Sequence, residues 1–174
     1  MKPILCLLML CVFFVGCSSR PNTSGTRASA SPVEVKKITS TGVVHATAKP
    51  VVDISPGGSG ELIVALKIDN GYHVNANPPT FPYLKATELL ITPGEGFSAT
   101  PISYPPATTK KFPFADKPLA VYEGDLALKS TIKANTSAPR GEHSMAAVLR
   151  VQACDEQVCY PPGQIDLRIP ILMK

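Results

Sequence analysis

The sequence contains no tryptophan, and aromatic residues occupy only 6% of its 174 positions. The Cys…Trp…Cys core of antibody domains is therefore excluded. The 17 Lys and Arg residues are scattered, and without a basic stripe or helix face no nucleic-acid-binding surface is indicated. A hydrolase has little support, because the sequence lacks a nucleophile elbow, a zinc-binding helix motif and a paired-carboxylate pattern.

Proline and glycine, by contrast, are abundant, with 18 and 12 residues spread through the chain. They divide it into short segments, which argues against long helices. A chain of this length, after loss of any export signal, can form one domain of ordinary size with its own core.

The N-terminus has the form of an export signal. A charged start is followed by an apolar run from Ile4 to Val15, which is too short to span a bilayer comfortably. The run closes on Gly16-Cys17, which resembles the bacterial lipobox, although an ordinary signal peptide could end in the same way. We expect residues 1–16 to be a lipoprotein signal and Cys17 to be the lipidated N-terminus. Ser18, in place of Asp, favours the outer membrane.

Residues 17–38 are rich in Ser, Thr, Pro and Ala, which predicts a disordered tether. The protein would then lie in the periplasm, attached to the membrane by its lipid alone. Disulfides persist in that compartment. Because Cys6 and Cys11 leave with the signal and Cys17 carries lipid, the mature domain keeps one pair, Cys154 and Cys159.

Beyond the tether, apolar residues alternate with period two, the pattern of half-buried strands. The clearest stripe joins Leu62, Val64, Leu66 and Ile68. The expected strands are 42–48, 61–69, 72–75, 87–92, 97–104, 119–133 with a break at Gly124-Asp125, 146–153 and 165–171. Seven to nine short strands separated by Pro and Gly turns predict an all-β fold for residues 39–174, a single-domain β-sandwich that is immunoglobulin-like in architecture.

The cysteine pair is expected at a hairpin turn. Cys154 ends the strand 146–153, Cys159 begins the return toward Ile165, and residues 155–158 form the turn. Facing residues of such a hairpin come close enough for a disulfide if the turn is bulged or twisted. The bond could be redox-active or structural. Its short ring would contribute only roughly 2 kcal/mol of stability, which weakens the structural alternative.

No metal or other cofactor is expected. His45, His73 and His143 have no paired metal spacing, so each is interpreted as an ordinary surface or strand residue, and Met145 beside two cysteines is weak support for copper. Asp155 and Glu156 add negative charge beside the cysteines, which disfavours a thiolate. Such a pair suits a protein that depends on the more acidic thiol of a partner.

The segment 151–162, VQACDEQVCYPP, resembles the end of the N-terminal periplasmic domain of the thiol:disulfide interchange protein DsbD. Other landmarks follow the same order. Asn70-Gly71-Tyr72-His73-Val74 resembles the Gly-Trp-His strand of that family, and Tyr104-Pro105-Pro106 is followed by Lys111-Phe112 and Val121-Tyr122-Glu123-Gly124. The resemblance covers roughly residues 43–171.

The resemblance implies an immunoglobulin-like sandwich that takes electrons from a thioredoxin-like domain or a DsbD-type membrane electron conduit and passes them to oxidised periplasmic proteins. It assigns the mixed disulfide with partners to Cys159 and leaves Cys154 as the resolving thiol. A phenylalanine-bearing cap loop shields the pair in the family, and Phe112 or Phe114 is the candidate here. Asp155, Glu156, Tyr160 and Tyr72 are the expected neighbours of the redox site.

The chain departs from the family pattern in three respects. It stops at Lys174, without the membrane conduit and the thioredoxin-like domain of full-length members, so we expect it to need a partner for electrons. Tyr72 stands where the family has Trp. The spacing between the cysteines is one residue shorter than in the best-known member. An alternative function is therefore a lipid-anchored binding or scaffold module with a structural disulfide.

Overall fold

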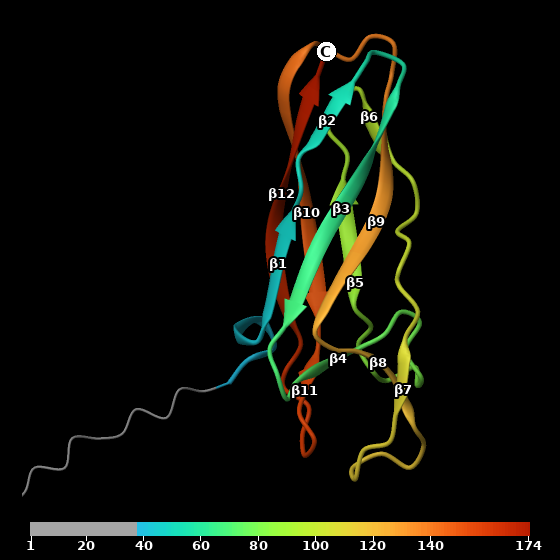
Figure 1. Ribbon diagram of the computed structural model, residues 1–174, viewed down its shortest axis with the longest axis vertical. Helices are drawn as coiled ribbons and strands as arrows, with labels where there is room; N and C mark the ends of the chain where they lie inside the picture. The colour runs from blue at the N-terminus through green and yellow to red at the C-terminus, as the bar shows by residue number, and fades with distance from the viewer. Residues whose placement is uncertain (1–37) are drawn as a thin grey trace, which may run out of the picture. The chain divides into compact units, whose positions relative to one another are not determined.

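A computed structural model describes residues 38–174 of the chain (Figure 1). The expected signal peptide, the Cys17 lipidation and nearly all of the expected tether lie outside the described residues. Within residues 38–174, no helix is long and apolar enough to cross a membrane. The elements of this part are η1 (Ser40–Gly42), β1 (Val44–Ala48), β2 (Val51–Ile54), β3 (Ser59–Ile68), β4 (His73–Asn75), β5 (Glu88–Thr92), β6 (Phe97–Ala99), β7 (Thr108–Lys110), β8 (Leu119–Tyr122), β9 (Asp125–Ala134), β10 (Gly141–Val151), β11 (Ala153–Cys154) and β12 (Gly163–Met173). The all-β prediction is confirmed, with more strands than expected.

The first sheet has the order β1-β3-β9-β6, with every neighbouring pair antiparallel. Alternation along β3 directs one set of side chains inward, as the sequence predicted. The buried members of this set are Leu62, Val64, Leu66 and Ile68. Leu128 and Ile132 of β9 are buried as well, so the two central strands of this sheet form one side of the core.

The second sheet has the order β2-β12-β10-β5 and is built on a long antiparallel hairpin. In that hairpin β10 and β12 pair from Gly141↔Met173 to Val151↔Gly163. The predicted inward positions of β10 are buried, and so are Ile169 and Ile171 of β12. The two sheets enclose one main hydrophobic cluster, which confirms the sandwich.

Strand β2 was not predicted from the sequence, and its backbone gives the reason. It pairs in parallel with β12, and the register shifts between Ile171 and Met173. Asp53 has a φ of 65°, an unusual value for a residue other than glycine. Val51 and Ile54 are both buried although they are three positions apart. A regular strand would direct them to opposite faces, so the period-two pattern is lost.

A third, small sheet lies at one end of the sandwich, in the order β11-β4-β8-β7 (Figure 1). The chain passes from this small sheet into the first sheet at the predicted break. Gly124 has a φ of 64°, and β8 and β9 on its two sides belong to different sheets. The small sheet has a hydrophobic cluster of its own around Phe112, Leu119 and Val121.

Two other strand predictions differ from the structure. The expected strand 97–104 is limited to β6, after which Pro101 interrupts the ladder and only an isolated bridge joins Ser103 to Lys129. Strand β7 was not predicted, because it is an edge strand whose two threonines are exposed and carry no apolar alternation.

Candidate functional site

The cysteine turn lies at the end of the sandwich that carries the small sheet (Figure 1). Cys154 and Cys159 form a disulfide, with their Cα atoms 3.9 Å apart. The two residues face each other in an antiparallel bridge, and the Asp155 amide donates to the Val158 carbonyl at 2.9 Å. The predicted hairpin turn is therefore present.

The strand that leads into this turn is not continuous, contrary to the prediction for residues 146–153. It divides at Gln152 into β10 and β11, and β11 pairs with β4 of the small sheet instead of with β12. The Gln152 side chain links the loop after β4 to the segment after the cysteine turn. Its Oε1 accepts from the Lys85 amide at 3.2 Å and its Nε2 donates to the Tyr160 carbonyl at 3.3 Å. The strand exchange places Cys154 beside β4.

Asp155 organises the turn between the cysteines. Its Oδ1 accepts from the amides of Gln157 and Val158 at 2.7 and 2.8 Å, and its Oδ2 accepts from the Tyr160 hydroxyl at 2.5 Å. The Tyr160 hydrogen bond, followed by the two amides, lowers the pKa of the Asp155 carboxyl. The same bond raises the pKa of Tyr160 to about 12. The carboxylate thus stabilises the backbone that carries both cysteines.

The two cysteines differ in exposure. Cys154 is fully buried and its strand is paired on both sides, with β4 and with the Cys159 bridge. Cys159 is half-buried. A thiol of another protein must approach the disulfide from solvent, and Cys159 is the less buried residue of the pair.

Aromatic side chains cover the face of the small sheet behind Cys154. Phe112 is buried and stacks on the His73 ring, with centroids 4.0 Å apart. Phe114 stacks on Phe112 at 5.3 Å and is 40% exposed. Of the two candidate shielding residues, the structure therefore places Phe112 inside, over the strand that pairs with Cys154, and Phe114 outside it.

The other expected neighbours lie around the same turn. The rings of Tyr72 and Tyr160 are 6.0 Å apart and tilted relative to each other. Glu156 is exposed and, with Tyr72 and His73, lines a cleft of about 230 Å³. Lys110 and Glu123 line the same cleft and form an ion pair at 2.8 Å. All four predicted neighbours of the cysteine pair are brought together.

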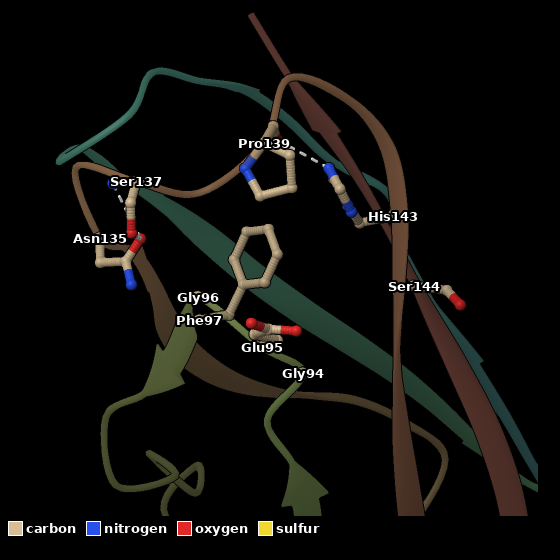
Figure 2. A pocket seen from close by; sticks show the side chains of 9 residues that line it. All are labelled: Gly94, Glu95, Gly96, Phe97, Asn135, Ser137, Pro139, His143 and Ser144. Carbon is tan, nitrogen blue, oxygen red and sulfur yellow. Dashed lines mark hydrogen bonds between the residues drawn. The ribbon is translucent and has the colours of Figure 1, made fainter.

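A larger pocket lies at the opposite end of the sandwich, where β6 is located (Figure 1, Figure 2). Its volume is about 500 Å³. The Phe97 ring stands at its centre, 5.3 Å from the His143 ring, whose Nε2 lies 2.8 Å from the Pro139 carbonyl oxygen (Figure 2). No cysteine lines this pocket, and the cysteines among residues 38–174 are Cys154 and Cys159 of the cysteine turn.

Sequence reasoning overlooked three residues of the site. His73 was interpreted as an ordinary strand residue, yet it is buried directly opposite Cys154. Lys110 and Glu123 were not predicted as site residues, although Glu123 lies in the Val121-Tyr122-Glu123-Gly124 landmark. The signal available for His73 was its place in the Gly71-Tyr72-His73 segment, which resembles the Gly-Trp-His strand of the family.

The fold and the turn together define a class, an immunoglobulin-like β-sandwich with one disulfide in an edge turn. A family model described as the N-terminal domain of the thiol:disulfide interchange protein DsbD matches residues 42–168. The chain belongs to this family, whose role is thiol–disulfide exchange. The match agrees with the range of the resemblance.

Solved structures with a similar arrangement are distant. The N-terminal periplasmic domain of ScsB from Proteus mirabilis is 17% identical, with a TM-score of 0.49 over 72% of this chain and 44% of that chain. The present chain therefore spans less than half of that structure. A PapD-like domain of human CEP192 is 10% identical, with a TM-score of 0.34 over 80% of this chain and 92% of that chain. Comparison with curated protein sequences gives no significant match.

Proposed function

We propose that this protein passes reducing equivalents from a thioredoxin-like domain or a DsbD-type membrane electron conduit to oxidised periplasmic proteins, through the dithiol of Cys154 and Cys159. The observation that carries the proposal is the disulfide between these residues, in a chain of the DsbD N-terminal family, with Cys154 buried and Cys159 half-buried. No cofactor is part of the proposed reaction.

The difference in burial supports a division of roles. A thiolate of the electron donor attacks Cys159 Sγ, a bond forms between the two sulfurs, the Cys154–Cys159 bond breaks, and its electron pair leaves on Cys154 Sγ. A second donor thiolate then attacks the donor–Cys159 bond and leaves both cysteines reduced. Transfer to a substrate runs through the same kind of mixed disulfide on Cys159, which Cys154 resolves. Cys159 is the contact and Cys154 the resolving thiol.

The charges around the turn favour dependence on a partner. Asp155 and Glu156 lie next to the pair, and negative charge disfavours a free thiolate. Asp155 is already held by three hydrogen-bond donors of the turn, which leaves its charge fixed close to Cys154. A dithiol in these surroundings reacts best with a more acidic thiol supplied by another protein.

Phe112 is the residue we propose as the shield of the pair. It is buried, it stacks on the strand residue opposite Cys154, and its loop is closed by Lys111, whose Nζ donates to the carbonyl of Asp116 at 2.6 Å. Phe114 stacks on the outside of Phe112 and has much less of its own surface buried.

We also propose that residues 1–16 are a lipoprotein signal, that 17–38 carry the lipidated Cys17 and a tether, and that 39–174 form the exchange domain. The periplasmic character of the family supports this location. A lipid anchor in the outer membrane would place the domain among exported proteins.

The reduction potential of the pair tests the proposed exchange against a purely structural disulfide. The protein is equilibrated with a glutathione series and the fraction of reduced Cys154 and Cys159 is measured by thiol alkylation. A potential in the range of exchange proteins, roughly −120 to −270 mV, with electron transfer from a reduced thioredoxin-like protein, is the expected result. A potential far below about −300 mV without any such transfer would favour the scaffold module.

A further inference from the structure

His73 has a position that the proposed exchange does not yet use. It begins β4 and is the direct partner of Cys154 in the β4–β11 ladder. Residues directly opposite each other in antiparallel strands project to the same side of the sheet, with β-carbons about 4.5 to 5.5 Å apart. The imidazole and the buried sulfur are therefore neighbours in space, although 81 positions separate them in sequence.

The His73 ring is buried and incompletely satisfied. Only 1% of the residue is exposed, and Phe112 covers one face of the ring. Its Nε2 is buried and has no hydrogen-bond partner while the disulfide is closed. A buried polar atom without a partner lowers stability, so its presence in a folded site calls for an explanation.

The charged groups that act on His73 come from β7, from the residue after β8 and from the cysteine turn. Burial is the largest influence and lowers the pKa of His73 below its ordinary value of 6.5. Lys110 at the end of β7 acts in the same direction, while Glu123 after β8 and Asp155 and Glu156 of the cysteine turn oppose it. The imidazole is neutral at pH 7, and one of its ring nitrogens can accept a proton.

We propose that His73 is the proton acceptor for Cys154 when that thiol resolves a mixed disulfide on Cys159, an inference that rests on the proposed exchange function. The Cys154 thiol gives its proton to the imidazole. Its sulfur then attacks Cys159 Sγ, the Cys154–Cys159 bond forms, the bond from Cys159 to the substrate sulfur breaks, and the substrate leaves as a thiolate. The imidazolium returns the proton to that thiolate or to water. The reverse sequence opens the disulfide.

One equivalent of 5,5′-dithiobis(2-nitrobenzoate) added to the reduced protein separates the two steps. The attack of Cys159 releases a first coloured thiolate in a bimolecular phase, and the closure by Cys154 releases a second in a unimolecular phase. For His73→Phe, which keeps an aromatic ring against Phe112, we expect the second phase at pH 7 to slow at least about tenfold. The first phase should remain nearly unchanged. His143→Phe, at the opposite end of the sandwich, is the matched control.

The pH profile distinguishes proton transfer from a packing role. In the wild type the second phase should be nearly independent of pH above 6.5, because the neutral imidazole is then fully available. In His73→Phe it should instead rise about tenfold for each pH unit toward the thiol pKa of roughly 8.5. A second phase with the same rate and pH profile in both proteins would overturn the role of His73 and leave the exchange proposal standing.

Two further results complete the test. If the wild-type protein gives no second release at all, Cys154 does not resolve the adduct, and both the exchange proposal and the role of His73 fail. If His73→Phe does not fold, the ¹⁵N resonances of the His73 imidazole in the wild-type protein test the proposed role instead. Reduction of the disulfide should shift the His73 Nε2 resonance while those of His143 stay in place. Identical spectra of oxidised and reduced protein would contradict the inference.

Discussion

Asp155 is the residue that determines the shape of the cysteine turn. Three donors converge on its carboxylate, two backbone amides and the Tyr160 hydroxyl. An Asp side chain that accepts from amides two and three positions later is a common way to form a tight turn. In this protein that turn holds the two sulfurs within bonding distance.

Replacing Asp155 with Asn should lower the Tm at pH 7 by roughly 2 to 5 °C, because the charge that accepts the three hydrogen bonds is lost. The folded-state pKa of Asp155 is depressed, so its contribution to stability is present above the ordinary value of 3.8 and is lost as the pH falls below it. The difference in Tm between wild type and variant should therefore persist at pH 7 and shrink at pH 3. Thermal unfolding at both values checks this.

The matched control for this change is Asp166→Asn, an exposed Asp of β12 that makes no hydrogen bond among the described side chains. Its Tm should equal that of the wild type at pH 7. An Asp155→Asn protein as stable as the wild type at pH 7 would show that the turn does not depend on the carboxylate.

From the residues alone, without the family resemblance, the site could be predicted only where the reactive side chains lie close together in the sequence. Cys154, Cys159, Asp155 and Tyr160 lie within seven positions, and the expected export signal and lipidation left no other cysteine pair to consider. The importance of His73 depends on the pairing of β4 with β11, a contact between distant segments that no local pattern encodes. A histidine in an alternating segment looks the same whether it faces water or a sulfur.

At the scale of elements, the loop between β7 and β8 is the part of the site that substitutions can change with the least effect on the main core. It carries Phe112 over His73 and belongs to a hydrophobic cluster separate from the main core. Phe81 and Leu84, from the loop that follows β4, pack against the same cluster. Phe112 and its neighbours can therefore be changed without altering the main core of the sandwich.

Phe112→Leu should increase the rate at which glutathione reduces the disulfide several-fold, since the smaller side chain opens the face behind Cys154. The change should cost on the order of 1 kcal/mol of stability, as expected for a conservative substitution in a small cluster. Reduction followed by quenched alkylation gives the rate. Phe114→Leu, which alters an exposed ring of the same stack, is the control. Equal rates in the two variants would argue against Phe112 as the shield.

The strands differ in how well the sequence predicts them. The stripe along β3 is buried on one face because a central strand of a sandwich shows clean alternation. Strand β2 was not predicted, because the irregular backbone at Asp53 shifts its pattern, and β7 because an edge strand needs no apolar face. The exchange of the chain between sheets at Gln152 also had no signal, since β10 and β11 are one residue apart.

At the scale of the whole molecule, the proposed relay depends on partners and on location. The family model covers only the domain that carries the cysteine pair. The domain has one disulfide among its described residues and, under the proposal, reacts only when a donor thiol reaches Cys159. A membrane anchor would keep it close to such donors.

Cys17→Ser should abolish lipidation and move the protein from the membrane fraction to the soluble periplasmic fraction. Cell fractionation followed by immunoblotting measures the distribution, and metabolic labelling with a radioactive fatty acid should mark the wild type alone. The folded domain should be unaffected, so its circular dichroism spectrum serves as the control. A Cys17→Ser protein that still carries the label would contradict the lipid assignment.

The most direct test of the account is trapping in cells that produce Cys154→Ser. Removal of the resolving thiol leaves Cys159 able to form mixed disulfides but unable to release them, so we expect partners with thioredoxin-like or exported sequences to accumulate as adducts that reducing agents dissolve. The matched variant Cys159→Ser, with only the buried sulfur, should trap none. Equal absence of adducts from both variants, or adducts formed by Cys159→Ser instead, would contradict exchange through Cys159.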